Sequence, residues 1–384
     1  MSWHRGGADD ENAMAGGARK QLPFVTRGRG EPRYPSIGGS LALTAGARAR
    51  LERVPCLLCQ ADDDEPIIAV ADWRYGLSVE PLVIVRCRRC GLSYLNPRPV
   101  GSHMHHFYPS PYYERRQVDG GASPEAARGM AAARRTNKAA LDEQAQLCER
   151  AAQGGGAGRS VLDVGCASGV FLASMRQRSW DVLGVEISAD AAAWGERELG
   201  LEIIDKPLTE AKLPAERFDV VTFWSSLEHF HDPLACLTEA RRILKPGGAA
   251  VILVPNFASP TVRHLHWGLD PPRHLYHFTP ATLELVLRRA GFEGRIERRS
   301  RTRIEDGALH GQVAKIGRLL RDSARNPAAR IAGWSLARLS PLMAPFSWCL
   351  TAAGLNAAMI VTARAGPRGH HPARRSRGSR IPPL

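Results

Sequence analysis

The chain has 384 residues, of which 44% are hydrophobic and 23% are charged. This composition is typical of globular proteins and excludes collagen, coiled coil and wholesale disorder, and the length suits two or three folded units. The formal net charge is +14, to which residues 364–384 contribute +6 and residues 1–50 contribute +4, leaving +4 for residues 51–363. Such basic tails suit any polyanion, including an anionic membrane, and do not by themselves indicate nucleic-acid binding.

Two features of the sequence concern the cellular compartment. The eight cysteines are too few for a disulfide scaffold in a chain of this length. The first 35 residues contain no apolar stretch that would form a secretory signal. Together these features predict a cytoplasmic protein whose cysteines are free, catalytic or bound to metal.

Composition and periodicity divide the chain into seven segments. Gly- and Arg-rich ends without a sustained period predict disorder, and apolar runs that alternate with helical patterns predict an α/β core. The predicted order is a disordered leader (1–50), a zinc-binding lobe (51–100), a linker and helical segment (101–158), the α/β core (159–306), a helical insert (307–356), a final strand (357–363) and a disordered basic tail (364–384).

Two C-x2-C pairs, Cys56 with Cys59 and Cys87 with Cys90, flank a strand-rich spacer of 27 residues. Four thiolates from two such turns can surround one zinc ion tetrahedrally, as in a zinc ribbon. The set is closed and leaves no coordination position for a substrate, so the sequence predicts a structural zinc in a small N-terminal lobe. An iron ion in the same geometry and four unligated cysteines are the alternatives.

Five apolar runs in the core alternate with helical patterns, which is typical of a parallel sheet with crossover helices. The predicted strands are Ser160–Val164, Asp181–Val185, Leu201–Ile204, Phe218–Phe223 and Ala249–Val254.

A glycine-rich turn follows the first of these strands, in V-L-D-V-G-C-A-S-G at 161–169. Glycines there let the backbone approach a ligand, but the turn lacks the G-x-G-x-x-G spacing of a dinucleotide site. Asp163 would repel a pyrophosphate and suits a ligand with a positive charge. Glu186 ends the second strand, where a carboxylate can accept both ribose hydroxyls. The two acids favour a nucleoside with a cationic group and no phosphate, which is S-adenosylmethionine.

Residues 160–300 therefore resemble a class I S-adenosylmethionine-dependent methyltransferase. Besides 161–169, the resemblance rests on G-V-E-I-S at 184–188, F-D-V-V at 218–221 and L-K-P-G-G at 244–248. It implies a Rossmann-like α/β fold with a mostly parallel seven-stranded sheet and helices on both faces, closed by an antiparallel pair from 295–299 and 357–363. The implied cofactor-binding residues are Asp163, Gly165, Cys166, Ala167, Gly169, Glu186, Ile187, Trp224 and Ser225.

Polar residues gather where the fourth and fifth strands end, which is the edge at which open α/β sheets bind ligands. His229 is the candidate general base, because the unperturbed pKa of histidine lies near neutrality. Glu228 could orient His229 or a substrate hydroxyl, and hydrogen bonding within the loop is the alternative role for both. Arg273 could clamp a phosphate or carboxylate. The remaining candidates for the acceptor side are His274, His277 and Tyr113.

Three features are similar to motifs of bacterial zinc-binding methyltransferases for surface sugars and natural products. They are the zinc knuckles, R-C-x-x-C-G-L-x-Y-L-N-P-R-P at 86–99 and R-H-L-Y-H-F-T at 273–279. This resemblance implies a small-molecule acceptor, such as a sugar or nucleotide-sugar, and supports His229 as the base. DNA is not an expected partner, because the N/D-P-P-aromatic and Pro-Cys motifs are missing after the fourth strand. An RNA methyltransferase with a zinc ribbon and a non-catalytic zinc-binding interaction protein are the alternatives, but aromatic residues do not interleave with basic ones as RNA stacking requires.

Residues 339–363 carry no charge, but two prolines, Gly354 and Asn356 interrupt them. A core helix with a final strand is therefore favoured over a membrane span. The insert 307–356 is expected to include a basic amphipathic helix, which could cover the substrate pocket or lie on an anionic membrane. The oligomeric state is not fixed by any motif.

Overall fold

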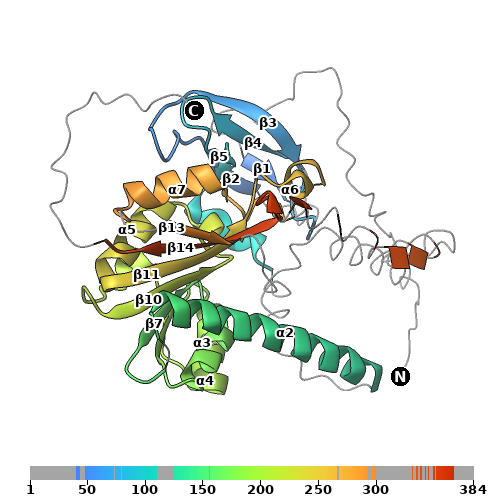
Figure 1. Ribbon diagram of the computed structural model, residues 1–384. Helices are drawn as coiled ribbons and strands as arrows, with labels where there is room; N and C mark the ends of the chain where they lie inside the picture. Colours follow the sequence, from blue (N-terminus) through green and yellow to red (C-terminus); the bar gives the residue numbers. More distant parts are fainter. Residues whose placement is uncertain are drawn as a thin grey trace, which may run out of the picture. The chain divides into compact units, whose positions relative to one another are not determined.

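A computed structural model of the chain describes the central part of the sequence and a segment near its C-terminus (Figure 1). The described residues are 40–43, 48–109 except 73 and 79, 124–292 except 155, 266 and 267, 296–299, scattered positions between 331 and 350, and 352–366. They all belong to one unit, Tyr34–Leu384.

A seven-stranded sheet forms the centre of this unit, in the order β13-β14-β11-β10-β7-β8-β9. Neighbouring strands from β11 to β9 are parallel, whereas β14 runs antiparallel to both of its neighbours. The chain order reverses between β7 and β10, which places a topological switch point there. The sheet confirms the predicted Rossmann-like α/β fold. Its strands are β7 (Ser160–Val164), β8 (Asp181–Val185), β9 (Ile203–Ile204), β10 (Phe218–Trp224), β11 (Leu244–Pro255), β13 (Ile296–Arg299) and β14 (Ala358–Arg364).

Alternate side chains of the strands pack against different helical layers. On β10, Val221 and Phe223 belong to the core cluster that includes α5 and α7, whereas Val220 and Trp224 belong to the cluster that includes α2 and α3. A strand covered by helices on both faces requires this period of two, and Figure 1 shows the two layers. The helices are α2 (Pro124–Ala151), α3 (Val170–Arg176), α4 (Ala189–Leu199), α5 (Pro233–Ile243), α6 (Pro260–Leu265) and α7 (Pro280–Arg289).

The loop between β10 and α5 contains a short 3-10 helix, η3 (Leu227–His229). Its far end is fixed by the cap of α5, where the Asp232 side chain accepts a hydrogen bond of 2.8 Å from the Ala235 N–H and Pro233 follows in the first turn. Its near end follows β10 at the switch point. The end of β10 and the cap of α5 thus hold His229 at the carboxyl edge of the sheet.

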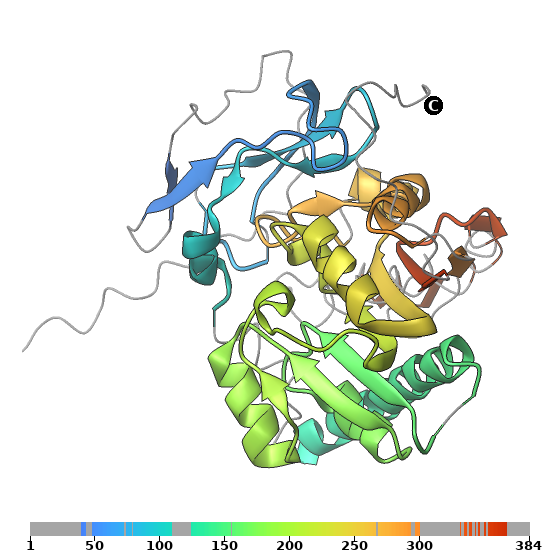
Figure 2. The same cartoon turned by 90° about the vertical axis from the view of Figure 1, so that its left-hand side faces the viewer.

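Two small sheets precede the core in sequence. One has the order β12-β5-β4-β3 and the other the order β1-β2-β6. The strand β12 comes from the methyltransferase-like region, and its Tyr276 and His277 pair with Tyr94 and Ser93 of β5 (Figure 2). Further strands are β1 (Ser40–Ala42), β2 (Arg48–Glu52), β3 (Asp64–Val70), β4 (Leu82–Cys87), β5 (Ser93–Leu95), β6 (Arg98–Pro99) and β12 (Tyr276–His277). The lobe is therefore completed by a core strand.

The predicted disordered leader extends too far. Leu41 and Ala49 are fully buried and pair with each other between β1 and β2, so residues 40–43 and 48–50 of this range are folded. The lobe buries its apolar side chains in the same cluster as the core, as Leu92 and Tyr94 illustrate. The N-terminal sheets thus share the core of the larger domain.

The C-terminal strand β14 pairs with β13 from Ile296 opposite Ala363 to Arg299 opposite Ile360, which confirms the predicted closing pair. Most of the predicted insert, 307–356, lies outside the described residues. Within it, four large apolar side chains are between 50% and 75% exposed: Ile331, Trp334, Leu339 and Leu342. Among the described residues, none of the helices combines the length and the apolar character that a membrane crossing needs. Contact of the insert with a membrane surface stays a prediction.

Candidate functional site

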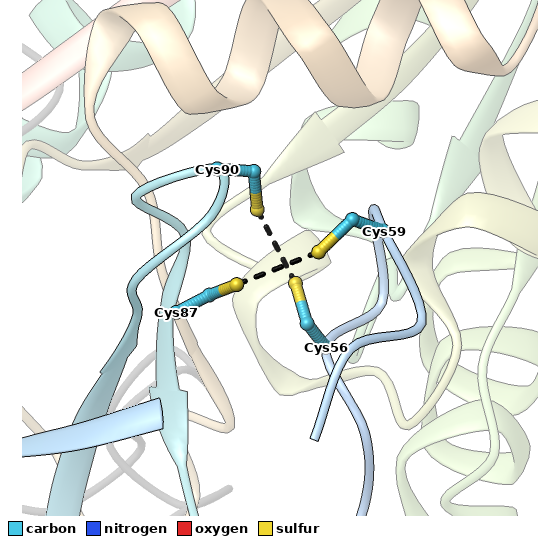
Figure 3. Close-up of side chains that lie close together, drawn as sticks. All are labelled: Cys56, Cys59, Cys87 and Cys90. Atoms are coloured by element: carbon cyan, nitrogen blue, oxygen red, sulfur yellow. Dashed lines mark hydrogen bonds between the residues drawn. The ribbon is translucent and has the colours of Figure 1, made fainter. Parts of the chain in front are cut away.

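Four cysteine sulfurs meet between two turns of the N-terminal lobe (Figure 3). All four Sγ atoms lie within 4.8 Å of one another, with Cys56 Sγ 3.3 Å from Cys90 Sγ and Cys59 Sγ 3.5 Å from Cys87 Sγ. Zinc–sulfur bonds of ~2.3 Å give a tetrahedron with edges of roughly 3.8 Å. A zinc ion fits among these sulfurs with little movement of the turns.

The backbone of each turn also suits thiolates. The N–H groups of Leu58 and Cys59 hydrogen-bond Cys56 Sγ, and the corresponding groups of the second turn hydrogen-bond Cys87 Sγ. Without a metal, the neighbouring Cys90 thiol and burial raise the pKa of Cys56 far above its usual range, and burial raises the pKa of Cys87 to about 11. A metal would hold the sulfurs as thiolates and make use of the backbone donors. The donor set fits the predicted closed zinc site.

An acidic cradle lies at the switch point of the main sheet. Asp163, near the carboxyl end of β7, is only 3% exposed and accepts a hydrogen bond of 2.7 Å from Thr222 Oγ1 on β10. The turn after β7 admits no side chain at Gly165, where φ is +75° and a Cβ would lie 2.7 Å from Ser226 Cβ. These residues hold the turn close to the end of β10.

Glu186 follows β8 and is tied to the glycine-rich turn. One carboxylate oxygen accepts a hydrogen bond of 2.8 Å from the Ala167 N–H, and the other accepts one of 2.9 Å from the Ser188 N–H. An ionised carboxylate can accept about four hydrogen bonds, so this orientation is compatible with ribose hydroxyls as further donors. Ile187 beside it is 69% exposed, which leaves an apolar surface next to the carboxylate. The arrangement fits the ribose and adenine ends of the predicted cofactor.

Two predicted cofactor residues, Cys166 and Trp224, have side chains that serve the fold, and a third, Gly169, leaves no room for one. Cys166 packs over Gly184, where a Cβ would lie 2.7 Å from its sulfur. Gly169 has a φ of +76°, and a Cβ there would lie 2.4 Å from Leu201 Cδ1. The Trp224 ring is 8% exposed and meets the Phe171 ring edge-on at 5.4 Å. The side chains of Cys166 and Trp224 therefore belong to the core, and contact of either residue with a cofactor stays a prediction.

Ser225 directly follows β10 and has a φ of +51°, while its N–H still donates to the Leu253 carbonyl of β11 at 2.9 Å. This left-handed conformation turns the chain sharply at the carboxyl edge of the sheet and is uncommon for a residue other than glycine. The turn brings the following residues, and with them His229, to the same edge as Asp163.

His229 is held by contacts from two distant segments. Its Nδ1 lies 3.0 Å from the Arg273 carbonyl oxygen and 3.0 Å from Tyr108 Oη. Because a carbonyl oxygen only accepts, we assign the proton of the neutral ring to Nδ1 and the lone pair to Nε2. The ring also packs edge-on against His274, with centroids 4.6 Å apart. This geometry is suited to a general base at Nε2.

Glu228 and His274 lie beside His229. Glu228 is 1% exposed, and its Oε1 lies 3.9 Å from His274 Nε2, which is too long for a hydrogen bond. Burial and the neighbouring His229 hold the pKa of His274 well below its usual value, so its ring is neutral. Ligand atoms of the three side chains lie within 4.8 Å of one another, a set of two imidazoles and a carboxylate that can also bind a divalent cation.

The predicted role of Arg273 as a clamp for a substrate anion is wrong. The guanidinium is 0% exposed. Its Nη2 donates to Asp72 Oδ1 at 2.8 Å and to Asp270 Oδ1 at 2.6 Å, and its Nη1 donates to the Phe107 carbonyl at 2.9 Å. Two carboxylates therefore neutralise its charge within the fold. Sequence reasoning missed Asp72 and Phe107, because Asp72 is 201 residues from Arg273 and no local pattern links them.

The structure places His277, a predicted acceptor residue, in the interior of the protein. His277 is 4% exposed in β12, with its ring centroid 5.2 Å from that of Phe257. Burial lowers its pKa to about 3. It is a neutral interior residue. Tyr113 lies outside the described residues, and the tyrosine that contacts His229 is Tyr108 from the same aromatic segment.

Comparisons with known proteins bear on the region that contains this site. Residues 132–295 match a family model described as a methyltransferase domain. The ubiquinone biosynthesis O-methyltransferases of Acinetobacter baumannii and Psychrobacter arcticus are 38% and 30% identical over 154 and 161 residues, which cover 36% and 38% of this chain. The chain spans 65% and 63% of the length of these relatives.

Two solved structures of S-adenosylmethionine-dependent methyltransferases are also similar. The protein from Archaeoglobus fulgidus is 21% identical with a TM-score of 0.37, and the likeness covers 54% of this chain and 86% of that one. The protein from Thermotoga maritima is 18% identical with a TM-score of 0.40, and the likeness covers 68% and 100%.

The parallel sheet and its switch point define a Rossmann-like α/β domain, and the acidic cradle lies at that switch point. The family match then gives its class. Residues 132–295 match a methyltransferase domain, and this match supports the class I S-adenosylmethionine-dependent methyltransferase that the sequence motifs predicted.

Proposed function

We propose that this chain transfers a methyl group from S-adenosylmethionine to a hydroxyl group of a small molecule, and that sugars and nucleotide-sugars are the first acceptors to test. The observation that carries the proposal is the contact of His229 Nδ1 with the Arg273 carbonyl, 3.0 Å away, at the carboxyl edge of the sheet. It leaves Nε2 with the lone pair that a general base needs.

The residues have distinct parts in this reaction. S-adenosylmethionine, when bound, supplies the methyl group and a sulfonium leaving group. Asp163 and Glu186 would bind the charged end and the ribose of the cofactor. His229 Nε2 would accept the hydroxyl proton as the acceptor oxygen is methylated, and the sulfonium sulfur of the bound cofactor would keep the electrons of the broken carbon–sulfur bond. Glu228 would orient the acceptor by accepting a hydrogen bond from a second hydroxyl.

The chemistry beside His229 favours a neutral, hydroxyl-bearing acceptor group. Arg273 is neutralised by Asp72 and Asp270 and offers no free positive charge to a phosphate. Burial keeps His274 neutral, so it offers no charge to an anion either. The phosphates of a nucleotide-sugar would have to lie elsewhere.

The curated relatives favour oxygen as the methylated atom, because both are named as O-methyltransferases of ubiquinone biosynthesis. A phenolic ring is for this reason the second candidate acceptor. The four-cysteine lobe supports the sugar class through its resemblance to zinc-binding sugar methyltransferases. Zinc is proposed as a structural ion in that lobe, with no part in the transfer.

The test is incubation of the metal-loaded chain with methyl-labelled S-adenosylmethionine and a panel of nucleotide-sugars and phenols. His229→Asn keeps an N–H at the Nδ1 position for the Arg273 carbonyl and removes the base at Nε2. We expect this variant to lose turnover by at least about 100-fold, while its affinity for the cofactor stays unchanged. Loss of cofactor binding together with turnover would mean that His229 has a structural role.

A further inference from the structure

A buried arginine connects the four-cysteine lobe to the loop that carries His229. Arg273 donates to Asp72, which lies between β3 and β4, and to the carbonyl of Phe107 at the end of η1 (Gly101–Phe107). Its guanidinium carbon also lies 4.8 Å from the centre of the Tyr75 ring. Three contacts of one fully buried side chain thus come from the N-terminal part of the chain.

Asp72 is itself fixed within the lobe. Its Oδ2 accepts a hydrogen bond of 2.9 Å from the Leu77 N–H, and its Oδ1 accepts the Arg273 guanidinium. Asp270 binds the same Nη2 at 2.6 Å. An arginine that satisfies two carboxylates and a carbonyl has little rotational freedom, because each hydrogen bond restricts the planar guanidinium.

The same two segments hold the imidazole of His229. The main-chain carbonyl of Arg273 binds Nδ1, and Tyr108, the residue after Phe107, places its hydroxyl 3.0 Å from the same atom. His274, the residue after Arg273, packs edge-on against the ring. Each of these three partners of His229 is therefore next to, or part of, a group that the Arg273 side chain fixes.

We propose that Arg273 is a positioning residue, which through its own carbonyl holds His229 in the Nδ1–H tautomer, and that Asp72 of the four-cysteine lobe keeps Arg273 in place. This inference rests on the proposed function for the use of the Nε2 lone pair, but the tautomer is a property of the protein alone. The four-cysteine lobe would accordingly help to hold the His229 tautomer, in addition to its contribution to the fold.

The tautomer is measured directly by long-range proton–nitrogen correlation spectra of the metal-loaded chain labelled with 15N-histidine. The His229 signals are identified by their loss in His229→Asn. In the wild-type protein we expect Nδ1 to give the protonated type of resonance and Nε2 the unprotonated type. In Asp72→Asn and Arg273→Lys we expect His229 to show a mixture of the two tautomers.

Asp219→Asn is the matched control. Asp219 lies at the opposite end of β10, where it is 7% exposed and bonds Arg159 and Lys245 at 2.8 Å and 2.6 Å. The Asp219→Asn substitution disrupts a comparable ion-pair network without touching the His229 loop. The His229 signals of this variant should therefore match those of the wild type. A general loosening of the fold would change the control and the two test variants alike.

Two results would overturn the inference. The first is an Nε2–H tautomer in the wild-type protein, which requires no variant to fold. The second is an unchanged Nδ1–H tautomer in folded Arg273→Lys or Asp72→Asn. Since neither result depends on methyl transfer, both are distinguishable from failure of the proposed function, which would appear as absence of turnover with the tautomer intact.

Discussion

His277→Leu is the variant whose effect follows most directly from the structure, because His277 is a basic group that the fold keeps neutral. Burial in β12 lowers its pKa from the ordinary 6.5 to about 3. Below the unfolded pKa, the unfolded chain binds a proton that the native chain does not bind. The contribution of neutral His277 to the free energy of unfolding is therefore fully present above pH 6.5 and is lost as the pH falls toward 3.

The size of the loss follows from the two pKa values. Between about pH 7 and pH 5, protonation of the unfolded histidine lowers the free energy of unfolding by about 2 kcal/mol. The native ring stays neutral throughout this range because its pKa is about 3. The wild-type protein should therefore lose about 2 kcal/mol more stability than His277→Leu over the same pH interval.

Urea denaturation of the metal-loaded proteins at the two pH values, followed by tryptophan fluorescence, measures this difference. Protonation of cysteines and carboxylates affects both proteins equally and cancels in the comparison. An equal loss of stability in the wild type and His277→Leu would refute the placement of His277 as a buried neutral residue, and would restore it as a candidate for acceptor binding.

Two further variants test the metal site and the cofactor turn. In Cys59→Ser, the metal should be lost on dialysis against a chelator. The control Cys349→Ser, at an exposed cysteine, should retain about one ion per chain by elemental analysis. Retention of the metal in both variants would exclude the four-cysteine site. Gly169→Ala should destabilise the protein by about 2 kcal/mol more than Gly247→Ala, because both glycines have positive φ but only at Gly169 does a Cβ meet a neighbour, Leu201 Cδ1 at 2.4 Å. Equal thermal shifts of the two variants would contradict this packing.

The fold was predictable from the sequence where the signals are local. The bounds of β7 and β8 agree with the predicted strands, because β7 is buried throughout and β8 over its last three residues, and a buried strand reads as one apolar run. The strand β9 is shorter than predicted, since the Leu201 N–H donates to the Gly195 carbonyl at the end of α4. The four cysteines were recognisable because each pair lies within a single turn.

The acceptor side was less predictable because its residues are defined by distant partners. In the sequence, R-H-L-Y-H-F-T at 273–279 has the polar character of a binding loop. In the structure, Arg273 finds its carboxylate 201 residues away, and His277 pairs with Ser93 of the lobe. Spacing and composition carry no record of such contacts, so a sequence pattern alone does not distinguish buried structural residues from ligands of a substrate.

The central claim is that Asp163 and Glu186 form a site for S-adenosylmethionine, and calorimetric titration of the metal-loaded chain with this nucleoside tests it most directly. The wild type should bind it, and Glu186→Gln should bind about 10-fold more weakly, because the amide would face the Ala167 or Ser188 N–H with a donor. Glu196→Gln, at an exposed position of α4, should bind like the wild type. A folded wild-type chain that takes up neither S-adenosylmethionine nor its demethylated product would contradict the account.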